Sequence, residues 1–193
     1  LDLEEIGADF YTANAHKWLC APKGSAFLYA RPAVQPLVEP LIVSWGDTGP
    51  FTVGQTFLDE LQWTGTRDLA AYLAVPAALR FWEEHDGPRV LAACRALARR
   101  ARAELGAFTG LPHLAPDSPA CYAQMFAVPL PPCDAARLQA DLYDRHRVEV
   151  PVAARLGRVL LRVSIQAYNS WSDVVRLREG LADALARQNV AVP

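Results

Sequence analysis

The segment at residues 9–29 constrains the fold of this chain more than any other stretch. Aromatic and β-branched residues at 10–12 favour extended backbone, and a second extended run at 25–30 follows a proline and a glycine that favour a turn. The segment therefore predicts two strands joined by a short loop. A flexible lysine amine becomes chemically useful when it is fixed at a strand end. The loop contains Asn14, His16 and Lys17.

The motif around this lysine carries a resemblance to a known family. The pattern Ala-Asp-Phe-Tyr-x-x-Asn-x-His-Lys-Trp-Leu-x-x-Pro-Lys-Gly at residues 8–24 is similar to the pyridoxal-phosphate lysine segment of class V aminotransferases. It is most similar to their isopenicillin N epimerase-like branch, which is related to cysteine desulfurases. In that family the lysine of the His-Lys pair forms a Schiff base with the cofactor, so the resemblance assigns this role to Lys17. Asn14 and His16 match positions at which relatives place polar side chains on the cofactor phosphate.

The residues around Lys17 offer a physical route to such reactivity. A Schiff base forms only from a neutral amine, so the site must favour the uncharged form through desolvation or nearby positive charge. Trp18 supplies an apolar wall, and His16 and Lys23 supply donors or charge. Without the resemblance, Lys17 would be a solvated lysine at a turn. Asn14 would then form the turn, and the histidine would bond the backbone.

A second motif, Gln-Trp-Thr-Gly-Thr-Arg-Asp, occupies residues 62–68. Gly65 permits close approach to the backbone, and Thr66 places a hydroxyl beside an exposed amide, which suits a phosphate oxygen. Asp68 is typical of the N-cap of a helix that begins at Leu69. From the residues alone, an ordinary turn followed by a cap is the simpler interpretation. The motif also resembles the family segment that reaches the partner subunit's cofactor phosphate, which implies a homodimer with Gly65 and Thr66 as cofactor-binding residues.

Arg162 lies in an alternating stretch at residues 158–165 that predicts a strand. Alternation places the odd-numbered apolar residues on one face and Arg162 with Ser164 on the other. Such an arginine is either solvated or held in a partly buried site that binds an anion, since guanidinium binds carboxylate through two parallel hydrogen bonds. The sequence Leu-Arg-Val-Ser-Ile-Gln-Ala-Tyr-Asn at 161–169 resembles the C-terminal signature of the same family. The resemblance implies that Arg162 binds the α-carboxylate of the substrate.

The resemblance implies an α/β fold, the C-terminal part of a fold type I pyridoxal-phosphate-dependent transferase. We expect residues 1–68 to form the end of the large cofactor-binding domain and residues 69–193 to form a small C-terminal α+β domain. In the family the cofactor lysine lies near the middle of a longer chain, so the resemblance covers only the C-terminal half. The ring-nitrogen aspartate, the ring-stacking residue and the phosphate loop would lie in a missing N-terminal half of the same protein. This chain is then expected to be a fragment that is inactive alone.

The implied activity is that of a pyridoxal-phosphate-dependent enzyme acting at the α-carbon of an amino acid or an amino-acid-containing substrate. Epimerase, aminotransferase and C–S lyase reactions all remain, because each needs only substrate exchange at Lys17 and proton transfer at Cα. Cysteine desulfurases carry a nucleophilic cysteine before the arginine strand, and residues 147–157 contain no cysteine. Desulfurase chemistry is therefore disfavoured. The alternative class is a non-catalytic structural or binding module that retains the fold.

Composition excludes other classes. Apolar residues make up 52% of the chain and charged residues 21%, which is typical of a globular protein. No apolar run is long enough to span a bilayer, and a net charge of −2 gives no reason to expect nucleic acid or an anionic membrane as a partner. The cysteines lack metal-binding spacing, so we expect no metal site and reduced thiols in the cytoplasm. They are Cys20, Cys94, Cys121 and Cys133.

One helical stretch, from Gly87 to Leu105, has apolar residues at helical spacing on one face and arginines on the other. The arginine face could be a nucleic-acid patch or the solvated side of an amphipathic helix. Acidic residues balance the chain and no aromatic residues interleave with the arginines, so the second interpretation is preferred. The arginines are Arg95, Arg99, Arg100 and Arg102.

The remaining elements follow from propensity and periodicity. We expect a helix at 69–85 that is interrupted at Pro76, and a final helix that begins after a capping box at Ser170 and Asp173. Further strands are predicted at 41–44, 122–128 and 148–150, a helix at 135–146, a loop at 45–50 and extended or irregular chain at 57–63.

Overall fold

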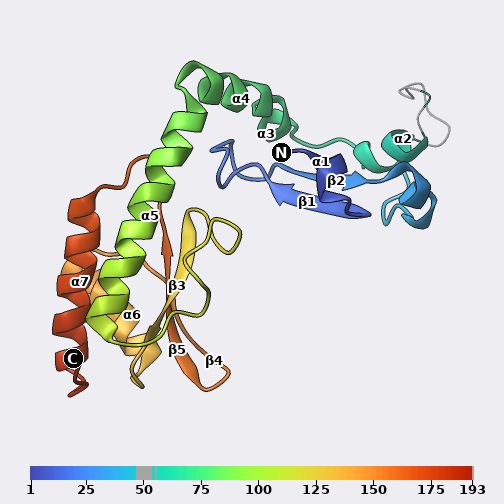
Figure 1. The fold of residues 1–193 in the computed structure, drawn as a ribbon. Helices are drawn as coiled ribbons and strands as arrows, with labels where there is room; N and C mark the ends of the chain where they lie inside the picture. Colours follow the sequence, from blue (N-terminus) through green and yellow to red (C-terminus); the bar gives the residue numbers. More distant parts are fainter. Residues whose placement is uncertain (47–53, 55, 193) are drawn as a thin grey trace. The chain divides into compact units, whose positions relative to one another are not determined.

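The structure is a computed structural model, which describes residues 1–46, 54 and 56–192 (Figure 1). The chain divides into two compact units, Leu1–Glu84 and His85–Pro193. Each unit is described by itself. The predicted domain boundary at residues 68 and 69 stays a prediction, and most of the loop expected at 45–50 lies outside the described residues.

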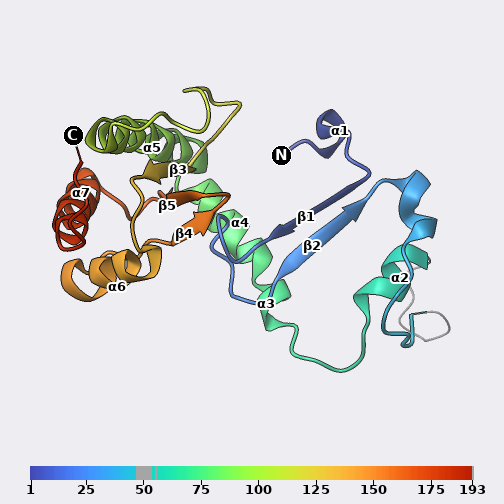
Figure 2. The same ribbon diagram turned by 90° about the horizontal axis from the view of Figure 1, so that it is seen from below.

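A two-stranded antiparallel sheet forms the centre of the first unit, as predicted (Figure 2). Strand β1 spans Phe10–Asn14 and β2 spans Ala26–Ala30, with Phe10 opposite Ala30 and Asn14 opposite Ala26. An ion pair between Asp9 and Arg31, 2.6 Å long, joins the two ends of the hairpin. The strand ends therefore hold the loop at residues 15–25 at a defined place.

The helices of the first unit are short. The predicted interruption near Pro76 is confirmed, because α3 ends at Leu73 and α4 begins at Val75. The strand expected at 41–44 is wrong, since those residues form bends and irregular chain. The extended chain expected at 57–63 is also wrong. The elements are α1 at Leu3–Ile6, the 3₁₀ helix η1 at Pro32–Leu37, α2 at Thr56–Gln62, α3 at Ala70–Leu73 and α4 at Val75–Glu84.

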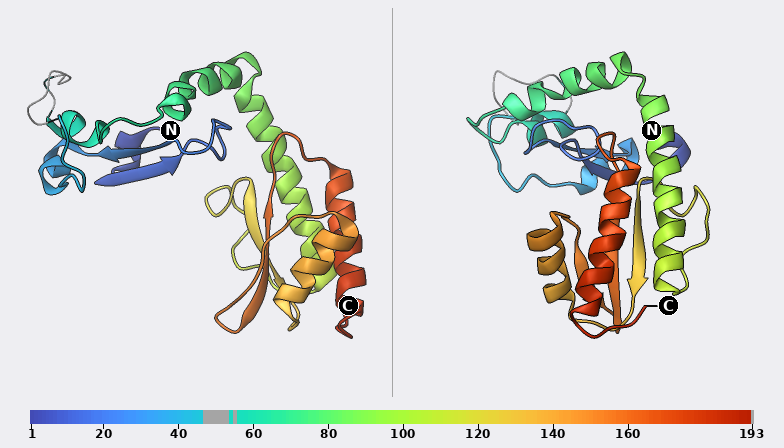
Figure 3. Two further views of the ribbon diagram at one scale, coloured as in Figure 1. Left: turned by 180° about the vertical axis from the view of Figure 1, so that it is seen from behind. Right: turned by 90° about the vertical axis from the view of Figure 1, so that its left-hand side faces the viewer.

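A three-stranded antiparallel sheet in the order β3-β5-β4 forms the second unit together with three helices (Figure 3). The strands are β3 at Met125–Leu130, β4 at Val152–Arg155 and β5 at Arg158–Ser164. The helices are α5 at Gly87–Thr109, α6 at Ala135–His146 and α7 at Trp171–Ala186. This confirms the small α+β arrangement that the sequence predicts for this part of the chain.

The buried core lies in the second unit. Its members come from α5, α6, α7 and the three strands, and they include the fully buried Leu105, Leu138, Leu161 and Leu181. Alternation along β5 follows the prediction, because Leu161 and Val163 are buried while Arg162 and Ser164 are exposed. The core therefore fixes one face of β5 and leaves the arginine on the other face.

Three expectations for the second unit need correction. Helix α5 continues past Leu105 to Thr109 and ends at Gly110, whose positive φ of 64° provides the cap. Strand β3 begins at Met125 instead of Tyr122. No strand forms at 148–150, since pairing with β5 begins at Val152.

The arginine face of α5 is only partly solvated. Arg102 is 7% exposed, and its guanidinium donates to the carbonyl oxygen of Ala115. Arg99 forms an ion pair with Asp117 at 2.7 Å. The guanidinium of Arg100 lies over the ring of Trp171, 3.5 Å from its centroid. These arginines contact groups of the protein itself, and Arg102 contradicts the prediction that all four are solvated.

Candidate functional site

Lys17 lies in the loop between β1 and β2, as predicted. The loop is ordered by backbone hydrogen bonds, in which the N–H of Ala21 donates to Ala15 and the N–H of Ala15 donates to Ser25. Ala15, Ala21 and Ser25 of this loop are buried, and the Ser25 hydroxyl donates to the carbonyl oxygen of Pro22 at 3.0 Å. The loop therefore has a small buried base, while Lys17 itself is exposed.

The other two predicted residues of this loop differ in environment. Asn14 is the last residue of β1 and is exposed. His16 is half-buried, and its Nδ1 atom is buried without a hydrogen-bond partner among the described residues. A buried ring nitrogen without a partner costs free energy, so this atom can gain from a polar ligand.

The predicted phosphate segment connects α2 to α3 in the same unit. Gly65 has a φ of +106°, a conformation that suits glycine, and a Cβ atom built there would meet nothing within 4 Å. Thr66 is exposed beside it. The Asp68 carboxylate accepts a hydrogen bond from the N–H of Ala70 at 2.8 Å, while Leu69 takes the N-cap position. The cap thus lies one residue away from the predicted position.

The segment and the lysine loop are related through α3, which directly follows the segment. A Cβ atom built on Gly24, at the end of the lysine loop, would lie 3.9 Å from the Cβ of Ala71 in α3. His16 and Lys17 thus share one loop with Asn14 at the end of the preceding strand, and Gly65 and Thr66 lie on a second segment of the same unit. The remaining predicted residue, Arg162, belongs to the second unit.

Arg162 projects from the open face of β5. It lies opposite Ala127 of β3, whose small side chain leaves room beside it. Its backbone N–H donates to the carbonyl oxygen of Pro151 at 3.0 Å, at the point where β4 is about to begin. Within the described part of the chain, no side chain forms a hydrogen bond or ion pair with the guanidinium. The guanidinium is therefore available to an anion.

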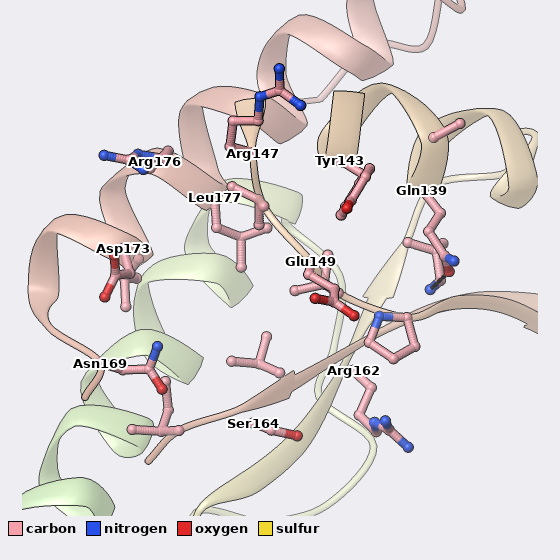
Figure 4. Close-up of a pocket in the computed structure, with 18 of the residues that line it drawn as sticks. Gln139, Tyr143, Arg147, Glu149, Arg162, Ser164, Asn169, Asp173, Arg176 and Leu177 are labelled. Carbon is pink, nitrogen blue, oxygen red and sulfur yellow. Dashed lines mark hydrogen bonds between the residues drawn. The ribbon is translucent and has the colours of Figure 1, made fainter. Parts of the chain in front are cut away.

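A hollow of about 1140 Å³ lies beside Arg162 in the second unit (Figure 4). Strand β5 continues past Leu161, which pairs with Val152 at the start of β4, and residues 163–165 line the hollow. The N–H of Ile165 donates to Gln124 next to β3, so antiparallel alternation directs the N–H of Ser164 to the opposite edge. The walls come from α6, from the N-terminal part of α7 and from residues 147–152.

Glu149 is a polar residue of this hollow that sequence analysis missed. It is exposed and lies near the middle of the hollow in Figure 4, with Arg162 to one side and Arg147 to the other. The prediction of a strand at 148–150 assigned Glu149 to a β-sheet and gave it no binding role. The signal that could have revealed it is the alternation of Val148, Glu149 and Val150, which separates the carboxylate from two apolar neighbours.

The comparison with protein families agrees with the resemblance carried by the lysine motif. The model of the family described as "Aminotransferase class-V" matches residues 1–177. The chain belongs to this family.

A curated relative and two solved structures extend the match. The isopenicillin N epimerase of Amycolatopsis lactamdurans is 38% identical over 193 residues, which cover 95% of this chain and 48% of the relative. The cysteine desulfurase CsdA of Escherichia coli superposes with a TM-score of 0.77 at 20% identity and covers 97% of this chain and 48% of its own. A mutant of C-DES with glycine covalently linked to its PLP cofactor gives a TM-score of 0.72 at 19% identity, covering 95% and 48%.

These matches show a fold type I architecture and the extent of the chain within it. The chain spans about half the length of the relatives it matches. This agrees with the prediction that the resemblance covers the C-terminal half of the class V aminotransferase fold. In the described part of the chain, no helix is long and apolar enough to cross a membrane, and no group of histidine, cysteine and acidic residues could hold a metal ion.

No cysteine is among the described residues that line the hollow beside Arg162. Cys133 borders a separate hollow near Pro132, and burial followed by the nearby charge of Asp134 raises the pKa of its thiol. Cys94 is buried in the core, where desolvation raises its thiol pKa. A raised pKa lowers the thiolate fraction, and the thiolate is the nucleophile. Neither thiol is therefore suited to persulfide formation beside Arg162.

Proposed function

We propose that this chain is part of a pyridoxal-phosphate-dependent enzyme that acts at the α-carbon of an amino acid or an amino-acid-containing substrate. The observation that carries the proposal is the family match over residues 1–177 together with the motif that holds Lys17 between β1 and β2. The curated relative is an epimerase, and the structural neighbours include a desulfurase. The other half of the fold would come from an N-terminal part of the same protein.

The residues of the lysine loop fit the cofactor. Lys17 is exposed, and among the described residues nothing hydrogen-bonds or ion-pairs with its amine, so the amine can bond the cofactor aldehyde. The buried and unpartnered Nδ1 of His16, with the amide of Asn14, would bind polar groups of the cofactor. In a homodimer, the open backbone at Gly65 and the hydroxyl of Thr66 would reach the phosphate of the partner subunit.

Arg162 would bind the substrate. Its guanidinium can hold an α-carboxylate through two parallel hydrogen bonds, and the edge N–H of Ser164 can add a third donor. Bidentate binding fixes both the position and the orientation of the carboxylate, which sets the Cα–H bond of the substrate in a defined direction. Ala127, opposite Arg162, keeps that side of the strand free of bulk.

Lys17 would move the proton. The bound cofactor supplies an electron sink that stabilises negative charge at Cα. When the substrate amine occupies the position of the Lys17 amine, Lys17 is free, and its amine can accept the Cα proton and return it. Epimerisation would require a second group that delivers a proton to the opposite face of Cα, and a C–S lyase would instead release the sulfur group from Cβ as a thiol or sulfide that takes up a proton. Desulfurase chemistry stays disfavoured, since residues 147–157 offer no cysteine. A cytoplasmic location is part of the same proposal.

Covalent trapping tests the role of Lys17. The chain contains two lysines, Lys17 and Lys23, which makes the assignment simple. The protein is incubated with excess pyridoxal phosphate, reduced with borohydride and mapped by peptide mass spectrometry. We expect the adduct on Lys17, its loss in Lys17→Arg and its retention in the matched Lys23→Arg variant. An adduct confined to Lys23 or to the terminal amine would overturn the enzyme proposal and favour a non-catalytic module.

A further inference from the structure

We propose that Glu149 forms a subsite for a positively charged group of the substrate, so that the enzyme acts on an amino acid or peptide with a second amine beyond its α-amine. The inference rests on the proposed function, in which Arg162 binds the α-carboxylate. It names the substrate class of that site, which the family match leaves open.

The segment that carries Glu149 is held at both ends. On one side the N–H of Val148 donates to the carbonyl oxygen of Leu142, at the C-terminal end of α6, at 3.0 Å. On the other side the N–H of Val152 donates to Oε1 of Gln139 at 2.8 Å. The hydrogen bond between Arg162 and Pro151 adds a third attachment. Glu149 therefore projects from a chain segment with a defined path, which is what a binding group requires.

The direction of the Glu149 side chain follows from its neighbours. Val148 and Val150 pack against the core and are half-buried, and Val152 is buried. Glu149 and Pro151 alternate with them and are exposed. The carbonyl of Pro151 pairs with the N–H of Arg162. Glu149 is two residues before Pro151 in the sequence and lies on the same wall of the hollow (Figure 4).

The two charged groups remain separate. No ion pair joins Glu149 to Arg162, and among the described residues no other group pairs with either side chain. The neighbouring Asp173 is engaged differently, because its carboxylate accepts the N–H of Ser170 at 2.8 Å. Other charged residues also line the hollow, namely Arg147, Arg176 and Asp144. Arg162 and Glu149 are distinguished by their place on one wall, where together they can bind a ligand that carries both signs of charge.

The complementary cation is a second amine. In the proposed function the α-amine of the substrate bonds the cofactor, so it is not available to a carboxylate. The hollow of about 1140 Å³ is also larger than the range of about 300 to 1,000 Å³ that is typical of small-molecule sites, so it has room for a long substrate. A carboxylate placed along the wall from the guanidinium can then bind an ammonium group on the substrate side chain.

Blocked amino acids isolate this interaction from cofactor chemistry. Nα-acetyl-L-lysine and Nα-acetyl-L-norleucine both offer the carboxylate, lack a free α-amine and differ in the terminal ammonium group. Their binding to the cofactor-free chain is measured by NMR titration for the wild type and for four variants. The variants are Glu149→Gln, Asp144→Asn in the same hollow, Glu179→Gln on the exposed surface of α7 and Arg162→Gln.

We expect the lysine derivative to bind about fivefold more tightly than the norleucine derivative, as for a partly exposed charge pair. Glu149→Gln should remove this preference, whereas Asp144→Asn and Glu179→Gln should keep it. Arg162→Gln should weaken both derivatives equally. Equal binding of the two derivatives by the wild type, no binding of either, or a preference that survives in Glu149→Gln overturns the subsite. The lysine adduct described above tests the proposed function separately, because it requires neither Glu149 nor a substrate.

Discussion

The Oε1 atom of Gln139 accepts a hydrogen bond from the backbone N–H of Val152 at 2.8 Å. A side chain of α6 thus holds the chain where β4 begins and where the segment with Glu149 ends. Val152 is buried as a residue, whereas Gln139 is exposed, so the hydrogen bond between them is partly buried. Both partners of this bond line the hollow beside Arg162.

Two substitutions of Gln139 distinguish the contribution of its hydrogen-bond acceptor to stability from that of the rest of its side chain. Gln139→Leu removes the acceptor of a partly buried N–H and should lower the free energy of unfolding by about 0.5 to 1.5 kcal/mol. Gln139→Glu keeps a carbonyl-type acceptor at the same place and should remain close to the wild type at neutral pH. Urea unfolding followed by circular dichroism measures both variants. Equal stability of the two variants would show that this hydrogen bond contributes nothing.

Asp183 should give the protein a defined sensitivity to acid. Its Oδ2 atom accepts a hydrogen bond from Nε of Arg187 at 2.8 Å and lies 3.0 Å from Nε2 of His146. Hydrogen bonds from Arg187 and then from His146 hold the pKa of this carboxyl below its ordinary value. A folded-state pKa below the unfolded one means that the carboxylate stabilises the fold fully above the unfolded value of about 3.9. The contribution is lost as pH falls through the folded-state pKa.

The comparison of the wild type with Asp183→Asn tests this sensitivity. The difference between their free energies of unfolding should shrink as pH falls below about pH 4, because the Asp183 carboxylate of the wild type then becomes protonated. Urea titrations at a series of pH values measure it. A difference that stays the same down to pH 2.5 would contradict the role given to Asp183.

Local patterns predicted the parts of the fold that local contacts determine. The helix expected at 135–146 is observed at Ala135–His146, because its periodicity and its cap at Asp134 lie within a few residues. The capping box also forms, with the N–H of Ser170 donating to Asp173. Alternation along β5 was enough to place Arg162 on the open face. For the same reason the loop position of Lys17 could be predicted from the two runs that flank it.

Contacts between distant residues determine the parts that sequence analysis missed. The apolar run at 41–44 has strand propensity but forms no strand, since strand formation requires a partner. Arg102 is buried because the chain beyond α5 returns over it, with Ala115 and Tyr122 beside its guanidinium. The strand expected at 148–150, which includes Glu149, does not form, because pairing with β5 begins at Val152. Such positions depend on register and on chain return, which periodicity does not encode.

Gly106 lies in α5 directly beneath the ring of His113. A Cβ atom built on Gly106 would lie 2.4 Å from Cε1 of His113, so the ring must move if the glycine is replaced. Burial, with the nearby charge of Arg102, lowers the pKa of His113, which agrees with a ring packed against the helix. We expect Gly106→Ala to lower the free energy of unfolding by about 1 to 3 kcal/mol through overpacking.

A double variant separates packing from helix propensity at this position. In a His113→Ala background the obstacle is absent, and Gly106→Ala should raise the stability by up to about 1 kcal/mol because alanine favours the helix. The change in stability caused by Gly106→Ala therefore has opposite signs in the two backgrounds. Thermal unfolding of the four proteins in this cycle measures the effect. The same sign in both backgrounds would show that the ring does not limit the space at Gly106.

The second unit should fold without the first. The buried core is formed by residues of the second unit, while the first unit buries mainly Ala15, Ala21, Ser25 and Ala30. The first unit also leaves large apolar side chains exposed, among them Leu37, Leu41, Val43 and Leu73. Because apolar burial is the main favourable contribution to folding, most of the stability resides in the second unit.

Expression of residues 85–193 tests this distribution. The fragment keeps Asp86, whose carboxylate accepts the N–H of Arg89 and caps α5. We expect a dispersed NMR spectrum and a cooperative thermal transition for this fragment, and neither for residues 1–84 alone. Addition of the 1–84 fragment should leave the transition unchanged. If residues 85–193 failed to unfold cooperatively, their core would need support from the chain that carries Lys17, and the two units could not be regarded as independent in stability.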